Sequence, residues 1–132
     1  MVVAATLVLL ATGQLLSRSP LVIGLQVLAL AVMAWARLSL AGAFAVTAEP
    51  RGEALVEVGP YRWVRHPQFA GALLLIGSAV LSHISWLSLG TGLAVAGLVA
   101  VRIACEERLL RARFADYAAY AARTRRLVPL IL

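Results

Sequence analysis

The chain contains no lysine and a single cysteine, and only 14% of its 132 residues are charged. One cysteine excludes an internal disulfide framework and a multi-cysteine metal site. A soluble domain is about 25% charged, whereas this chain is 62% hydrophobic, with a mean hydropathy of +0.91. A chain of this size cannot hide so much apolar surface in its own core. The composition therefore predicts one domain, residues 1–132, that lies in a membrane.

All twelve basic residues are arginine, and the formal net charge is +6. Sixteen of the eighteen charged residues lie in two segments, 49–66 and 102–126. A nucleic-acid-binding surface needs basic residues spread over a solvated face, so we expect no nucleic-acid partner. Basic residues gathered in short segments are typical of the cytoplasmic loops of membrane proteins. Both segments are therefore expected on the cytoplasmic side.

Long uncharged stretches predict an all-α integral membrane protein with about four transmembrane helices, at 1–17, 20–44, 68–82 and 86–103. The last two share one uncharged stretch, 66–101, which as a single helix would be about 54 Å long. The hydrocarbon core is only about 30 Å thick, so this stretch is expected to form a helical hairpin that turns at Ser82–Ser85. The first stretch could instead be a signal peptide, although no basic residue precedes it.

An even number of spans places both termini on the cytoplasmic side, as in a bacterial-type inner (plasma) membrane. Beyond the fourth span, Leu110, Phe114, Tyr117 and Ala121 recur at helical spacing. This pattern predicts a cytoplasmic amphipathic helix over about 104–126 that lies at the membrane interface.

The segment GPYRWVRHPQFAG, Gly59–Gly71, leads into the third span. Each proline restricts the residue before it to extended conformations, and Pro67 suits the first turn of a helix. The N-terminus of that helix can receive an anion such as a carboxylate. His66 titrates near neutral pH and can donate, accept or relay a proton. The alternative is a purely structural role. Arg62 and Arg65 would then be basic anchors at the membrane surface, Tyr61 and Trp63 would belong to an aromatic belt, and His66 would cap the helix.

A second group, Arg102, Glu106 and Glu107, stands at the end of the fourth span. Arg102 and Glu106 are four residues apart on one helix face, and they follow an uncharged span directly. An ionisable pair at that depth is costly and indicates function. Glu107 and Arg111 have the same spacing, and here a surface ion pair worth a few tenths of a kcal/mol is the favoured interpretation.

The remaining polar residues point to no further chemistry. We expect His83 to lie in the outer turn without a functional role and Cys105 to be a small packing residue. We expect the Arg37 side chain to reach toward the cytoplasmic surface. No metal-ligand spacing, phosphate loop or Ser/His/Asp arrangement is present, so no metal cofactor is expected.

A family resemblance rests on two motifs in a fixed order, LVEVGPYRWVRHPQFAG (55–71) and R-x-x-x-E-E-x-x-L (102–110), with the predicted hairpin between them. It extends to Pro129 and covers about residues 40–130. The chain resembles the isoprenylcysteine carboxyl methyltransferase family and its relatives, the membrane phospholipid N-methyltransferases. The resemblance implies an integral membrane enzyme that transfers a methyl group from S-adenosylmethionine to a lipophilic acceptor, which enters from the bilayer.

The resemblance also implies roles for individual residues at the cytoplasmic side. Glu106 would bind the amine or ribose of the cofactor, Arg102 would orient the acceptor, and His66 would be a base or a ligand. These three are the candidate catalytic residues. The residues implied to line the cofactor pocket are Tyr61, Arg65, His66, Pro67, Phe69 and Glu106.

The chain departs from the family pattern at Phe69, where the family usually has tyrosine, and at Ala115, where it usually has glycine. A carboxyl O-methyltransferase is the favoured interpretation. The alternatives are a phospholipid N-methyltransferase and a catalytically silent, lipid-binding protein of the same fold. A transporter or channel is disfavoured, because none of the four apolar stretches has a charge at its centre.

Overall fold

A computed structural model describes residues 19–46 and 55–128, which form helices joined by short non-helical segments. The described helices are α2 (Pro20–Val46), the short 3-10 helix η1 (Gly59–Arg62), α3 (Pro67–Ser82), α4 (Trp86–Arg113) and α5 (Tyr117–Arg123). These residues contain no β-strand, only an isolated parallel bridge between Val64 and Arg125. The predicted all-α fold is therefore confirmed for the described part of the chain.

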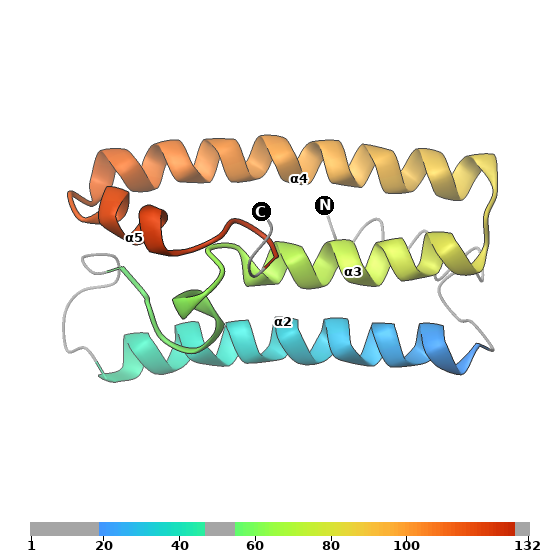
Figure 1. Ribbon diagram of the computed structural model, residues 1–132, viewed down its shortest axis with the longest axis horizontal. Coiled ribbons are helices and arrows are strands. Elements are labelled where there is room, and N and C mark those ends of the chain that lie inside the picture. Colours follow the sequence, from blue (N-terminus) through green and yellow to red (C-terminus); the bar gives the residue numbers. More distant parts are fainter. Residues whose placement is uncertain (1–18, 47–54, 129–132) are drawn as a thin grey trace.

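The three long helices lie side by side, with α3 between α2 and α4 (Figure 1). The chain direction alternates from each helix to the next, so α2 ends and α3 begins at the same end of the molecule. That end also carries η1, the last turns of α4 and α5. We call it the charged end, because residues 55–66 and 102–126, which hold most of the charges of the described chain, meet there.

Two of these helices are long and apolar enough to cross a membrane, α2 over Pro20–Ala41 and α4 over Trp86–Arg113. Their outward faces carry large apolar side chains, and Trp86 is 92% exposed. The third helix, α3, is apolar but has only 16 residues, about 24 Å at 1.5 Å per residue. The first expected span, 1–17, lies outside the described residues. The described residues thus support a membrane protein with two long candidate spans, and the set of four remains a prediction.

The hairpin turns where the sequence predicts, between the end of α3 at Ser82 and the start of α4 at Trp86. Ser85 caps α4 by accepting a hydrogen bond from the Ser88 amide, and Ser88 Oγ accepts one from the Ser85 amide. This reciprocal capping box satisfies two amides that would otherwise lack partners at a helix start. Below the turn, α3 and α4 share a core of Ile76, Ala79, Val95, Val99 and Ile103.

The expectation of one amphipathic helix over 104–126 is wrong. Helix α4 continues without a break to Arg113, and Phe114 then adopts an extended conformation (φ −117°, ψ 116°). The short helix α5 follows from Tyr117, and its two tyrosines are buried. A change from apolar to charged residues does not end a helix when no glycine or proline intervenes and the charges pair four residues apart, as Arg102 and Glu106 do.

Two close approaches of glycine fix α2 against the rest of the fold. At Gly71 of α3, a Cβ atom would come within 2.9 Å of the Ala29 carbonyl oxygen on α2, so only a residue without a side chain allows this spacing. Gly59 has φ +59° and lies against Ser39 of α2, whose Cβ would be 2.9 Å from an added Cβ. Its left-handed backbone is the conformation that glycine adopts readily, and it begins η1 at the charged end.

Candidate functional site

The loop between η1 and α3 brings His66 to the start of α3. His66 precedes Pro67, the first residue of the helix, and has φ −126° and ψ 57°. The loop is held by backbone hydrogen bonds to the C-terminal segment. The amides of Arg65 and His66 donate to the carbonyls of Arg125 (2.7 Å) and Arg126 (3.0 Å), and the Arg125 amide donates to the Trp63 carbonyl (2.9 Å). The irregular backbone predicted at Arg65 and His66 is therefore present, and these three backbone hydrogen bonds hold it in place.

The imidazole of His66 lies between two carboxylates and is almost completely buried, with 6% of the residue exposed. Its Nδ1 is 3.7 Å from Glu106 Oε2, and its Nε2 is 3.7 Å from Glu107 Oε1. Burial lowers the pKa of His66 below its usual value, and the two carboxylates only partly oppose this shift. The ring is therefore neutral at pH 7, and its Nε2 has no hydrogen-bond partner among the described residues.

Glu107 is the centre of the ionic contacts at this end, which corrects the prediction of a surface ion pair. Its side chain is only 5% exposed. It accepts a hydrogen bond from Arg65 Nε at 3.0 Å and two from Arg126, at 3.2 and 3.1 Å. The predicted contact with Arg111 exists as well, at 3.4 Å. The spacing along α4 indicated only the weakest of these pairs, because Arg65 and Arg126 lie far from Glu107 in the sequence.

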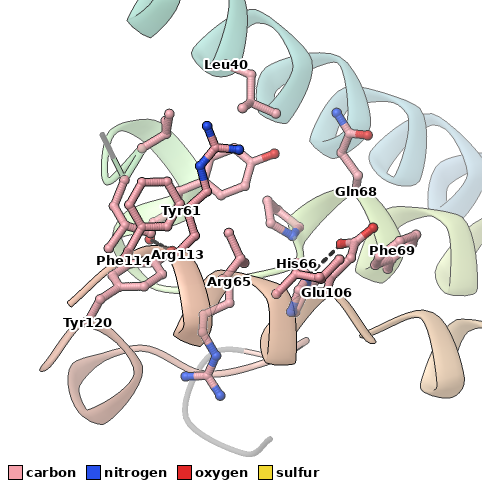
Figure 2. Close-up of a pocket in the computed structure, with 15 residues that line it drawn as sticks. Leu40, Tyr61, Arg65, His66, Gln68, Phe69, Glu106, Arg113, Phe114 and Tyr120 are labelled. Atoms are coloured by element: carbon pink, nitrogen blue, oxygen red, sulfur yellow. Dashed lines mark hydrogen bonds and ion pairs between the residues drawn. The ribbon is translucent and has the colours of Figure 1, made fainter. Parts of the chain in front are cut away.

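The predicted pair of Arg102 and Glu106 is formed, with Arg102 Nε 2.7 Å from Glu106 Oε1. The arginine is 64% exposed and the glutamate about one-third exposed. Glu106 therefore contacts Arg102 through one carboxylate oxygen and lies near His66 through the other. Figure 2 shows the side of Glu106 that is directed toward His66. It is the more accessible of the two neighbouring glutamates.

A pocket of about 480 Å³ opens beside His66 and Glu106. Ligand sites commonly have such a volume and combine mostly apolar walls with a few polar groups. The walls come from the end of α2, the loop before α3, the start of α3, the end of α4 and α5 (Figure 2). The lining residues are Leu40, Leu55, Val56, Tyr61, Arg65, His66, Pro67, Gln68, Phe69, Glu106, Leu109, Leu110, Arg113, Phe114 and Tyr120.

This pocket brings together all six residues that the sequence analysis expected to form a cofactor pocket. Arg102, expected to orient an acceptor, is not part of the lining. Arg65 contributes to the wall, but its guanidinium points away from the pocket toward the C-terminal segment (Figure 2). It donates there to the Ala121 carbonyl at 2.8 Å and to the Thr124 carbonyl.

Sequence reasoning missed three polar residues of the lining, Gln68, Arg113 and Tyr120. Arg113 follows Glu106 by seven residues, about two helical turns, so its position on the same face of α4 was a signal that could have found it. Tyr120 gave no such signal, because its hydroxyl reaches across the fold to donate to the Tyr61 carbonyl at 2.9 Å. Burial, followed by the charge of Glu106, raises the pKa of Tyr61 to about 12, so this phenol is neutral at pH 7.

Fold and site together define a helical membrane-type protein with a largely apolar pocket, which holds a few polar groups, at one end of an apolar bundle. The model of the isoprenylcysteine carboxyl methyltransferase (ICMT) family matches residues 20–112, more than half of the chain, and the chain belongs to this family. Family membership implies a membrane methyltransferase. No curated protein and no solved structure matches the chain in the corresponding comparisons.

Proposed function

We propose that the protein is an S-adenosylmethionine-dependent methyltransferase that acts on a lipophilic acceptor at the charged end of the helices. The observation that carries this proposal is the pocket itself. It places the buried imidazole of His66 and the carboxylate of Glu106 next to the apolar side chains of Leu40 and Leu109, at the end of two helices that can span a membrane. A polar cofactor and an apolar acceptor can therefore meet in one pocket.

The residues present fit the proposed cofactor. Glu106 offers a carboxylate to a cationic group, and His66 Nε2 is a buried polar atom without a partner among the described residues. Tyr61 and Phe69 add aromatic rings to the lining, and aromatic faces attract cations. When bound, the cofactor supplies an electrophilic methyl group, which is transferred by in-line displacement. Such a reaction depends mainly on positioning.

The chain's own residues would supply that positioning. Pro67 fixes the start of α3, and His66 is held by its backbone amide and by the surrounding side chains. The neutral imidazole can accept a proton from an acceptor, or it can bind the cofactor. Arg113 lines the pocket, and its guanidinium carbon lies 5.8 Å from the centroid of the Phe114 ring. Its guanidinium suits a carboxylate or phosphate on the acceptor.

The favoured acceptor is a prenylated thiol acid, as in a protein-S-isoprenylcysteine carboxyl O-methyltransferase, and an amine on a phospholipid headgroup is the alternative. We infer that the charged end faces the cytoplasm of a bacterial-type inner membrane, because basic segments remain on that side. The chain's arginines at this end support that orientation. The acceptor would then reach the pocket from the bilayer.

The proposal is tested by calorimetry with S-adenosylhomocysteine, the demethylated product, on the full chain in detergent. We expect binding by the native protein and at least tenfold weaker binding by Glu106→Gln. Asp116→Asn is the matched control, because Asp116 is exposed and its side chain makes no capping bond, and it should bind like the native protein. The absence of heat from a folded native sample would refute the proposal.

Methyl transfer is then followed with labelled cofactor and separate acceptors, a prenylcysteine analogue and an aminophospholipid. A catalytically silent protein is the second candidate, favoured by Phe69. The centroid of the Phe69 ring lies 5.8 Å from that of His66. Phenylalanine lacks the hydroxyl that tyrosine could use for a hydrogen bond at this position. Binding without transfer to any lipid extract would select this second candidate.

A further inference from the structure

We propose that Arg65 and Glu107 are a positioning pair that fixes His66 through the C-terminal segment, residues 121–126. We call the contacts of Arg65 and Glu107 with this segment the clamp. The role of the clamp in methyl transfer rests on the proposed function, whereas the clamp itself is a feature of the fold. This segment lies beyond residue 112, where the family match ends, and its partners Trp63, Arg65, His66 and Glu107 lie within the match. The inference therefore assigns a task to a part of the chain that the family match does not cover.

The guanidinium of Arg65 joins three parts of the chain. Its Nε donates to Glu107 on α4 at 3.0 Å, and its Nη1 donates to the Ala121 carbonyl at 2.8 Å and to both oxygens of Thr124. Only 10% of this side chain is exposed. A buried guanidinium with its donors directed at a carboxylate and backbone carbonyls is engaged in the fold, so little of it remains for a ligand.

Glu107 completes the clamp from α4. It binds Arg65 on one side and Arg126 on the other, and it does not line the pocket. Arg126 in turn accepts the His66 amide hydrogen on its backbone carbonyl, at 3.0 Å. A continuous path of contacts thus runs from Glu107 through Arg126 to the backbone of His66. Glu107 acts on the site through these residues rather than by touching a ligand.

Loss of the Glu107 charge would leave Arg65 buried without a counter-ion. Breaking one partner of a buried ion pair is strongly destabilising, because the remaining charge stays in a poorly solvated place. The structure can relieve this strain most easily by releasing the loop and the C-terminal segment into water. The helices would remain packed, because their shared core of Ile76, Val95 and Val99 does not include the clamp.

The clamp is tested by hydrogen exchange on the full chain in detergent, followed in peptides that cover residues 61–69 and 120–128. In Glu107→Gln we expect exchange of the loop amides to become at least tenfold faster, with exchange within α2 unchanged. S-adenosylhomocysteine binding should weaken in parallel. Asp116→Asn removes an exposed carboxylate and should change neither measurement.

Each result has a distinct meaning. Unchanged loop exchange in Glu107→Gln overturns the proposal, and weaker binding with unchanged exchange identifies Glu107 as a direct ligand instead. Faster loop exchange in a protein whose native form binds no S-adenosylhomocysteine supports the clamp and refutes only the proposed function.

A second variant decides the case if Glu107→Gln speeds exchange throughout the chain. Arg126→Gln removes an exposed guanidinium from the clamp and leaves Glu107 paired with Arg65. We expect exchange in residues 61–69 to become about threefold faster, with the interior of α2 unchanged. Loop exchange equal to that of the native protein would overturn the proposal.

Discussion

Replacing Gly71 by alanine tests the packing of α3 on α2. An added Cβ would meet the Met33 Cγ at 2.5 Å and the Ala29 carbonyl oxygen at 2.9 Å. The methionine side chain can move aside, but the carbonyl belongs to the backbone of α2. The two helices would therefore have to separate, and the start of α3 would shift with them. Gly77 lies six residues further along the same helix and has open space around its Cα, so Gly77→Ala is the matched control.

The magnitude follows from two opposing effects. Alanine is about 1 kcal/mol better than glycine inside a helix, and both variants gain this. Forcing an extra carbon into a well-packed interface costs about 1–3 kcal/mol, which only Gly71→Ala pays. Gly71→Ala is therefore expected to be less stable than Gly77→Ala by about 1–3 kcal/mol, while Gly77→Ala equals or exceeds the native protein.

The assay is reversible unfolding in mixed micelles, followed by circular dichroism, with the three proteins measured side by side. Equal stability of the two variants would show that α2 and α3 do not approach as closely as described. Loss of stability in both variants would show that the bundle does not follow ordinary helix propensities.

Two further predictions concern the loop before α3. Gly59→Ala should lower the free energy of unfolding by about 1–3 kcal/mol, because φ +59° is costly for an L-residue and the new Cβ would meet Ser39. The measurement is thermal unfolding, and the control is Gly24→Ala, because an added Cβ at Gly24 on α2 would meet open space. Because the pKa of His66 is lowered in the folded state, the folded protein binds fewer protons than the unfolded chain at mildly acidic pH. The contribution of His66 to the free energy of unfolding is therefore complete above pH 6.5 and is lost as the pH falls through the pKa of His66 in the folded state. Unfolding measured between pH 7.5 and 5 should show a steeper loss in the native protein than in His66→Gln, and equal slopes would contradict the described burial.

Features that depend on length or on local backbone preference could be predicted from the sequence. The hairpin turn at Ser82–Ser85 followed from an uncharged stretch too long for one span. The helix start at Pro67 followed from the preference of proline for the first turn. In both cases the deciding information lies in the continuous stretch of sequence that contains the feature.

Features that depend on distant partners could not be predicted in this way. Glu107 was interpreted through its neighbour Arg111, although its strongest partners are 42 and 19 residues away. The onset of charge after residue 101 predicts the end of α4 too early, because α4 continues to Arg113. The need for glycine at Gly59 depends on Ser39 of α2, which no local pattern identifies.

The exposed thiol of Cys105 offers a practical route to these measurements. It is the chain's single cysteine, it precedes Glu106 on α4, and it is not part of the pocket lining. A maleimide fluorophore would therefore attach at one position without mutagenesis, and the absence of lysine removes the commonest competing side chain. Its emission would report on the polarity beside the pocket as ligands enter. The same residue that carries no catalytic role in the fold thus becomes its optical probe.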